Sequence, residues 1–249
     1  NDRVIGGITP ICSQRAVELY KTFVEGDCII TNARTAEMAK LTENASRDVS
    51  IAFANELSMI CDEAGINVWE LIELANLHPR VNILQPGPGV GGHCIAVDPW
   101  FIVSKSPVTA RLIKSAREIN DSKPKWVVQK VKQAAGELLL ENVAALKSKV
   151  TIACYGLAFK PDIDDLRESP SLTIARLVST LGDINCVCVE PNISLDTKLE
   201  GINLVSLETA LKEADIHVML VDHKEFKSIA RPEGKVIDTK GVWDGYKLK

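Results

Sequence analysis

The stretch Val150-Thr151-Ile152-Ala153-Cys154-Tyr155-Gly156 decides the fold of the second half of the chain. Its apolar run ends in a glycine, which predicts a buried strand that turns sharply at its carboxyl end. Strands and helices then alternate, and this alternation predicts a parallel sheet with helices on both faces. Helical patterns occur at 171–181 and 207–214, and strand-like runs occur at 184–189, 216–221 and 236–238.

Upstream of residue 147 the pattern is helical. From about Thr35 to Ala64 the apolar residues recur at helical spacing, and no proline or glycine intervenes before Gly65. A helix of this length reaches about 45 Å, which suits a spine between domains or subunits. Further helices are predicted at 12–24, 68–77, 106–120 and 122–141, and brief extended runs at 3–7 and 28–31.

We therefore predict an all-helical domain over residues 1–146 and a Rossmann-like parallel α/β domain over 147–249. Ligands of open parallel sheets bind at the carboxyl ends of the strands, which places 156–161 at a binding edge. This single glycine turn is a weak signal and lacks the full dinucleotide fingerprint. The acidic run at 162–165 can equally be a solvated loop.

A second glycine-rich stretch lies between two of the predicted helices. Residues 86–92 hold four glycines and two prolines, so neither a helix nor a strand runs through them. The stretch then supplies Cys94 and, four residues later, Asp98. A thiol that emerges from a rigid glycine loop is placed like a nucleophile. The alternative is a tight turn that carries a buried cysteine.

The composition narrows the function classes. The chain has 249 residues and a formal net charge of −4, which gives no footprint for nucleic-acid binding. No apolar run approaches the roughly 20 residues of a membrane span, and the first residues do not resemble a signal peptide. Seven cysteines, an odd number, indicate reduced thiols in the cytoplasm. The first residue is not methionine, so we expect a piece of a longer protein.

No metal is expected from the sequence. Cys186 and Cys188 lie in a predicted strand with both thiols on one face, but two ligands do not complete a tetrahedral zinc site. We interpret this pair as packing. A zinc site at His93, Cys94 and Asp98 is a poor alternative.

Three segments together resemble the UDP-glucose/GDP-mannose dehydrogenase family: 35–44, 89–98, and 156–161 with 167–170. The resemblance implies three parts, namely an NAD-binding Rossmann domain, a central helical domain and a C-terminal domain that binds the nucleotide sugar. This chain resembles the last two only, so we expect the NAD domain to be missing. His93 before Cys94, together with 78–82 and 238–243, is similar to the branch that acts on UDP-N-acetyl-D-mannosamine. UDP-N-acetylglucosamine and UDP-glucose stay open as substrates.

The resemblance also implies a mechanism, the oxidation of the C6 alcohol to a carboxylate with two NAD. Cys94 would add to the aldehyde as a thiolate. Lys40 and Asn44, one helical turn apart, would stabilise the oxyanion, and Asp98 would position or deprotonate water.

The other roles implied by the resemblance concern binding. Arg80 would reach the substrate of a neighbouring subunit, Arg167 is the one candidate here for a contact with NAD, and the central domain would form a homodimer. An alternative class of function is an inactive dimer, which would bind a UDP-sugar without oxidising it. The residues expected to hold the UDP-sugar are Gly87, Gly89, Gly91, Gly92, His93, Phe159, Lys160 and Lys240.

Overall fold

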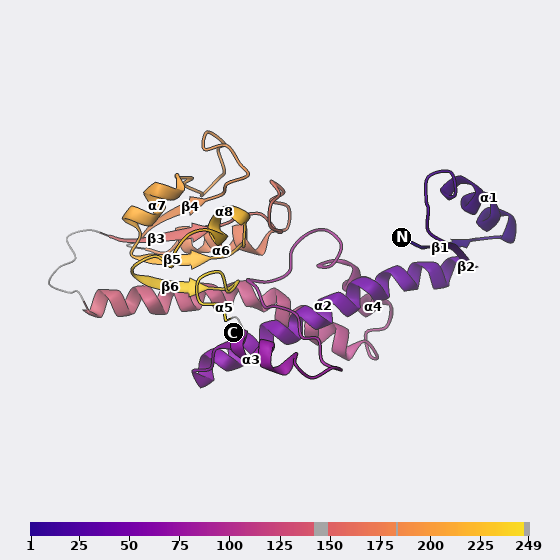
Figure 1. Cartoon of the computed structure of the whole chain (residues 1–249), viewed down its shortest axis with the longest axis horizontal. Coiled ribbons are helices and arrows are strands. Elements are labelled where there is room, and N and C mark those ends of the chain that lie inside the picture. Colours follow the sequence, from indigo (N-terminus) through magenta and orange to yellow (C-terminus); the bar gives the residue numbers. More distant parts are fainter. Residues whose placement is uncertain (142–148, 183, 247–249) are drawn as a thin grey trace.

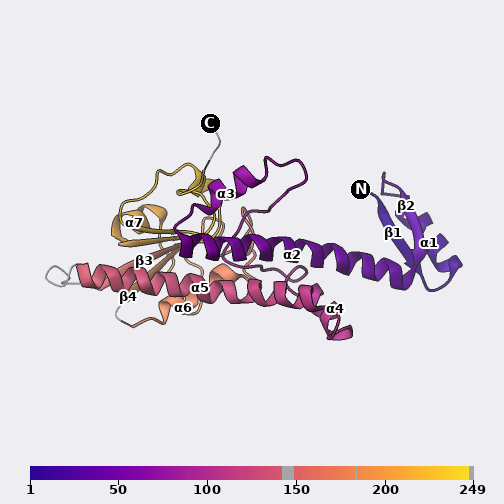
Figure 2. The ribbon, with the colours of Figure 1, turned by 90° about the horizontal axis from the view of Figure 1, so that it is seen from below.

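The computed structural model describes residues 1–141, 149–182 and 184–246 (Figure 1). A small unit at the N-terminus lies at one end of a long helix, and a parallel sheet lies toward the other end (Figures 1 and 2). The order of a helical region followed by a parallel sheet confirms the predicted fold class.

The N-terminal unit is a β–α–β arrangement. Strands β1 (Arg3–Gly7) and β2 (Cys28–Asn32) pair in parallel, and helix α1 (Pro10–Tyr20) connects them. The predicted extended runs are therefore partners, and the helical character assigned to 1–146 does not extend to these residues. A pairing between two short strands leaves no local pattern in sequence, which is why the prediction missed it.

Helix α2 (Ala33–Ala64) confirms the predicted long helix. The side chain of Asn32 accepts a hydrogen bond from the Thr35 N–H at 2.9 Å and so caps the first turn. Gly65 ends the helix in the left-handed conformation, with φ 67°. Helix α3 (Val68–Ala75) follows. Among the described residues, no helix combines the length and the apolar character that crossing a bilayer requires.

Helices α4 (Asp98–Lys105) and α5 (Arg111–Glu141) correct the next prediction. The two helices expected at 106–120 and 122–141 are one helix, which continues through Pro124. Proline removes one hydrogen bond from a helix, and packing can outweigh that loss. Here α5 runs in the same direction as α2 and lies beside it over part of its length (Figure 2).

The C-terminal region is the predicted parallel sheet, with strand order β4-β3-β5-β6 and all neighbours parallel. One face packs against α5 and α6, and the other against α7 and α8. The elements are β3 (Val150–Tyr155), α6 (Pro170–Ser179), β4 (Ile184–Val189), α7 (Leu207–Glu213), β5 (Ile216–Met219), α8 (Lys224–Lys227) and β6 (Lys235–Asp238).

The sheet and the helical region share a hydrophobic core. Val127, Val128 and Val131 of α5 are buried in the same cluster as Ile152 of β3 and Val218 of β5. The helical layer thus continues directly into the α/β region. The boundary predicted at 146/147 lies outside the described residues.

Candidate active site

The glycine-rich loop packs against α5 at its proline. Gly89 adopts φ +142°, and a Cβ on it would lie 3.3 Å from the carbonyl oxygen of Asn120 and 3.3 Å from Cδ of Pro124. That carbonyl is the one that Pro124, which has no N–H, leaves without its usual helical donor. The glycine-rich loop therefore packs against the turn of α5 in which this hydrogen bond is missing.

The same loop also presses on the C-terminal region. A Cβ on Gly91 would lie 2.5 Å from the carbonyl oxygen of Glu168 and 2.7 Å from Cδ of Pro170. Gly92 has φ +82°, and a Cβ there would lie 3.1 Å from the ring of Phe159. Glycine is needed at these positions because the backbone approaches its neighbours without room for a side chain.

Gly87, Gly89 and Gly92 have the G-x-G-x-x-G spacing of a dinucleotide fingerprint. In that fingerprint the glycines link a strand to the start of a helix within a βαβ unit. Here α3 ends at Ala75, α4 begins at Asp98, and no strand lies between them. The spacing therefore occurs without the structural context of a dinucleotide site.

A cavity of about 610 Å³ lies between the loop and the sheet. Its second wall comes from the residues after β3, Phe159 to Pro161, and after β5, Leu220 to Asp222. β3 and β5 are neighbours although β4 comes between them in sequence, so the cavity lies where the strand order reverses, the usual ligand site of such sheets. Six residues predicted to hold the ligand line this cavity: Gly87, Gly89, Gly91, Phe159, Lys160 and Lys240.

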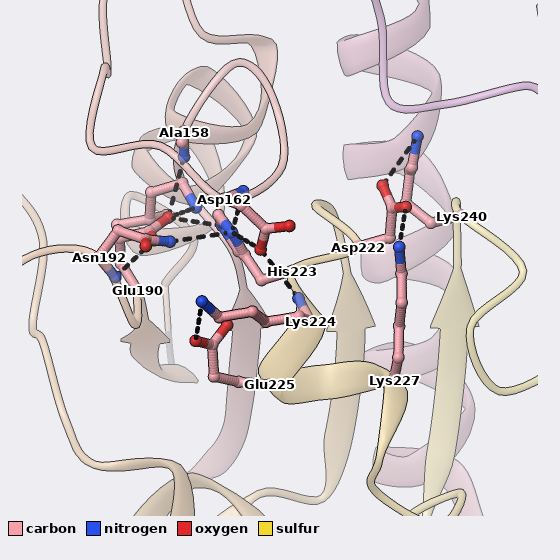
Figure 3. A network of polar contacts seen from close by, with 11 residues as sticks. Ala158, Asp162, Glu190, Asn192, Asp222, His223, Lys224, Glu225, Lys227 and Lys240 are labelled. Atoms are coloured by element: carbon pink, nitrogen blue, oxygen red, sulfur yellow. Dashed lines mark hydrogen bonds and ion pairs between the residues drawn. The ribbon is translucent and has the colours of Figure 1, made fainter.

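Lys240 is fixed at the cavity wall by a carboxylate. Its Nζ lies 3.3 Å from Oδ1 of Asp222, whose Oδ2 lies 3.0 Å from Nζ of Lys227 (Figure 3). Burial raises the pKa of Asp222, but the two lysines outweigh it and the net pKa is lowered. Asp222 therefore stays ionised and holds the ammonium of Lys240 beside the cavity.

The turn after β3 is closed by an internal carboxylate. Oε2 of Glu190 accepts the N–H of Leu157 at 2.6 Å and of Ala158 at 3.0 Å (Figure 3). In a nucleotide-binding turn such amides face a phosphate. At this binding edge, then, the amides of Leu157 and Ala158 already have their acceptor, whereas Phe159 and Lys160 face the cavity.

His223 completes this buried network. Its Nδ1 accepts the Asp162 N–H at 2.9 Å, so Nε2 carries the hydrogen of the neutral ring and donates to Glu190 at 3.2 Å. Burial raises the pKa of Glu190, but the hydrogen bonds from His223 and Leu157 outweigh it and the net pKa is lowered. The network joins the ends of β3, β4 and β5 (Figure 3).

Three of the four predicted catalytic residues lie together. Nδ2 of Asn44 on α2 donates to Oδ2 of Asp98 on α4 at 2.5 Å. The Asp98 N–H donates to the carbonyl of Cys94 at 2.8 Å, so the cysteine lies one turn upstream of the aspartate. The Cys94 residue is exposed, and its neighbours Gly91 and Ile95 line the cavity. An accessible thiol next to a ligand cavity meets the first requirement of a nucleophile.

Lys40 lies one helical turn before Asn44 on α2. Its side chain is 63% exposed and its Nζ lies 3.0 Å from Oε2 of Glu43. An exposed ion pair of this kind contributes roughly 0–1 kcal/mol, so little free energy opposes its exchange for another partner.

The remaining predicted residues lie outside the cavity lining. Arg80 and His93 are exposed, and the structure brings neither to the cavity. Arg167 is exposed and forms a bidentate contact with Asp165, with Nη2 to Oδ2 at 2.7 Å. Those hydrogen bonds lower the pKa of Asp165 to about 2.

Sequence reasoning missed a buried polar network behind the loop. Oδ1 of Asn55 accepts the Gly87 N–H at 2.8 Å, and Nδ2 of Asn55 donates to Asn120 at 2.9 Å. Asn120 donates to Asp48 at 2.8 Å, and Arg117 donates to Asp48 as well. The available signal was spacing, because Asp48 and Asn55 are seven residues apart and interrupt the apolar face of α2.

A smaller cavity of about 300 Å³ lies on the other side of Pro86 and Gly87. Lys123 faces it, buried, with Nζ 2.6 Å from Oγ of Ser58 and 3.8 Å from the ring centroid of Trp126. Burial lowers the pKa of Lys123 to about 7, although Asp62 opposes the shift.

Comparison with known proteins agrees with this architecture. Residues 34–122 match the central domain of the UDP-glucose/GDP-mannose dehydrogenase family, and residues 153–245 match its UDP binding domain. The two matched segments follow the order of the helical region and the parallel sheet in the structure. The chain belongs to the UDP-glucose/GDP-mannose dehydrogenase family.

Individual relatives indicate which members of the family this chain resembles. The chain is 63% identical over 248 residues to the UDP-N-acetyl-D-mannosamine dehydrogenase of Salmonella typhi, a match that covers 98% of this chain and 59% of that protein. It is 59% identical to the NDP-N-acetyl-D-galactosaminuronic acid dehydrogenase of Ralstonia solanacearum, covering 100% of this chain and 57% of the relative. The UDP-N-acetyl-mannosamine dehydrogenase Cap5O of Staphylococcus aureus superposes with TM-score 0.82 at 44% identity, over 99% of this chain and 57% of that one. The chain therefore spans somewhat more than half of the length of these relatives.

Proposed function

We propose that this chain forms the central and sugar-nucleotide-binding parts of an NAD-dependent dehydrogenase of the cytoplasm. The substrate is UDP-N-acetyl-D-mannosamine, which is oxidised at C6 to UDP-N-acetyl-D-mannosaminuronate. The observation that carries the proposal is the exposed Cys94 beside the Asn44–Asp98 pair, on a loop that also lines the 610 Å³ cavity. The identity to named mannosamine enzymes supports the choice of sugar.

The chemistry explains the choice of residues. An aldehyde loses a second hydride only after a nucleophile has added to its carbonyl carbon. The Cys94 thiolate adds and gives a thiohemiacetal, whose oxyanion Lys40 and the amide of Asn44 stabilise. Loss of hydride leaves a thioester on Cys94. Asp98 then orients and deprotonates a water that hydrolyses this thioester.

NAD accepts the two hydrides in the proposed reaction. The described residues do not fit a dinucleotide, because the G-x-G-x-x-G spacing lacks its strand and the amides after β3 are bound to Glu190. We therefore assign NAD binding to the part of the longer enzyme that lies outside this chain. Within this chain, Arg167 is the one residue that we propose as a contact with NAD, at the edge of the NAD site.

The sugar nucleotide would lie in the cavity. Lys160 and Lys240 offer positive charge for the diphosphate, and the glycine loop offers a wall with few side chains. Phe159, whose ring packs on Gly92, would hold the sugar side of the ligand near the loop. Arg80 and His93 are exposed, which supports a role for Arg80 in a neighbouring subunit and a role for His93 only after the ligand has bound.

A homodimer through the helical region is part of the proposal. Large apolar side chains that are exposed in the single chain support it, among them Phe53 and Ile60 of α2 and Leu74 of α3. Phe53 and Ile60 are seven residues apart and so share one face of the helix.

A nucleotide-linked N-acetyl-D-galactosamine is a second candidate substrate, because a relative named for N-acetyl-D-galactosaminuronic acid is almost as similar. UDP-N-acetylglucosamine and UDP-glucose remain further alternatives. The full-length enzyme, assayed for NADH formation with a panel of UDP- and GDP-sugars, separates these candidates. The highest kcat/KM is expected for UDP-N-acetyl-D-mannosamine, and a clear preference for another sugar would reject that assignment.

The covalent step has its own test. Cys94→Ser in the full-length enzyme should abolish uronate formation, because a serine hydroxyl is not ionised near neutral pH and is therefore a poorer nucleophile than a thiolate, and because an oxygen ester hydrolyses less readily than a thioester. Uronate formation at the normal rate would refute the cysteine mechanism. This chain alone should bind the UDP-sugar, measured by calorimetry, without reducing NAD; binding without turnover is also what the inactive-dimer alternative predicts, so the full-length assay decides between them.

A further inference from the structure

Three cysteines converge on one face of the sheet. Cys154 on β3 pairs in register with Cys188 on β4, and Cys186 lies two residues earlier on β4 and so on the same face. The three Sγ atoms all lie within 4.8 Å of one another, and none is in a disulfide. We call these three residues the thiol cluster. The sequence alone had suggested only the pair on β4.

The surroundings of the thiol cluster are apolar and enclosed. Cys154 and Cys188 are buried in the core cluster that also contains Ala175 and Val178 of α6. Cys186 is half-buried, and its sulfur lies 4.0 Å from the carbonyl oxygen of Ala175. Cys186 is therefore the member of the cluster nearest to solvent.

The spacing fits coordination with little movement. A bond of about 2.3 Å from each sulfur to a central ion places the sulfurs roughly 4 Å apart. The observed limit of 4.8 Å therefore needs an inward shift of less than about 1 Å. A single buried cysteine is ordinary packing, but three sulfurs directed at one point make a set of ligands.

We propose that the thiol cluster binds one thiophilic ion in three-coordinate geometry. A soft divalent cation would replace the S–H protons, releasing them to water as the S–M bonds form. A trivalent metalloid hydroxide would exchange its three hydroxyls for three thiols, releasing three waters and leaving a neutral product. No electron is transferred in either case. The apolar surroundings favour the product of lowest charge.

This site is separate from the proposed enzyme reaction. It lies on the α6 side of β3 and β4, whereas the ligand cavity lies at the carboxyl ends of β3 and β5. Its test therefore does not depend on the proposed substrate.

The test uses the 249-residue chain, kept reduced with a phosphine. Cadmium ion and arsenite are titrated separately. The bound ion is counted by native mass spectrometry, sulfur-to-cadmium charge transfer is followed by ultraviolet absorption, and Tm is measured with and without ion. One ion per chain and a raised Tm are expected, since an ion that binds the native state stabilises it.

Two variants remove ligands with different structural cost. Cys186→Ala changes a half-buried residue at the sheet edge, and Cys188→Val replaces a buried thiol by an apolar group of similar size. Each should weaken ion binding by at least tenfold, while Cys61→Ala, which removes an isolated buried thiol, should leave it unchanged. Tight binding of cadmium supports a divalent cation, and binding of arsenite alone supports a metalloid. No binding of either probe to the parent chain, or an affinity in both Cys186→Ala and Cys188→Val that equals that of the parent chain, overturns the proposal.

Discussion

Asn55 lies on α2, and its side chain joins the glycine loop to α5 through hydrogen bonds with Gly87 and Asn120. Replacing Asn55 by alanine leaves the Gly87 N–H and Oδ1 of Asn120 without partners in a buried place. The free energy of unfolding should fall by about 1–3 kcal/mol. In the full-length enzyme the KM for the UDP-sugar should rise, since Gly87 lines the cavity.

Ser58→Ala is the control for Asn55. Ser58 lies on the same helix and contacts Lys123, but the structure shows no hydrogen bond between its side chain and the loop. A KM that rises equally in both variants would mean that general loosening of α2, rather than the loop contact, causes the effect.

Lys123 gives the protein a specific pH dependence. Its folded pKa is about 7, whereas an unfolded lysine has a pKa of about 10.4. Between these values the unfolded chain binds more protons, so stability rises with pH, by at most about 1.4 kcal/mol per pH unit for one proton. Urea unfolding at pH 7 and pH 9 should show this rise, and Lys123→Met should reduce it. An identical slope in the variant would contradict this account.

Sequence reasoning could single out individual residues as candidates for the site, but it could not predict the contacts between them. Cys94 and Asp98 stood out because they follow a glycine run, and Asn44 through the family resemblance. The Asn44–Asp98 hydrogen bond joins residues 54 positions apart, and no local pattern encodes such a contact. The network around Asn55 was missed for the same reason: a polar residue within a helix gives no sign of whether its partner is water or a loop.

At the scale of the elements, the glycine loop packs so closely on its neighbours that it has no space for a side chain at Gly91. Gly91→Ala would place a Cβ 2.5 Å from the carbonyl of Glu168, so the loop must move. We expect a lower Tm and UDP-sugar binding weakened at least tenfold by calorimetry, because Gly91 also lines the cavity.

Gly136→Ala is the control, because alanine should raise the stability of the protein there instead of lowering it. Gly136 lies in α5, and a Cβ there meets nothing within 4 Å. Alanine should stabilise the helix by roughly 0.5–1 kcal/mol and leave binding unchanged. Equal ligand affinity in Gly91→Ala and the parent chain would remove the loop from the binding site.

Helix α5 shows where prediction by local rules fails. Two helices were expected over 106–120 and 122–141, yet one helix continues through Pro124 because it packs on α2 along one side and on the sheet along another. The long helix α2 was predicted correctly, since its apolar spacing and its terminal glycine are local signals.

At the scale of the whole molecule, the proposed dimer can be tested by placing negative charges on the apolar face of α2 that would form the interface. Phe53→Asp combined with Ile60→Asp places two carboxylates on one exposed apolar face of α2. Sedimentation should show a dimer for the parent chain and a monomer for this variant. Leu195→Asp, an equally exposed position in the α/β region, should remain dimeric. A dimer that persists in the α2 variant would place the interface elsewhere.

The shared core beneath the sheet limits how this protein can be dissected. Val127, Val128 and Val131 belong to a helix of the first region yet lie under strands of the second. A gene fragment that starts at residue 147 would lose this cover and expose the underside of the sheet to water. Such a fragment should collect in inclusion bodies, whereas one that begins at Arg111 keeps α5 and should refold, so the smallest segment that can fold around this sheet begins inside the helical region.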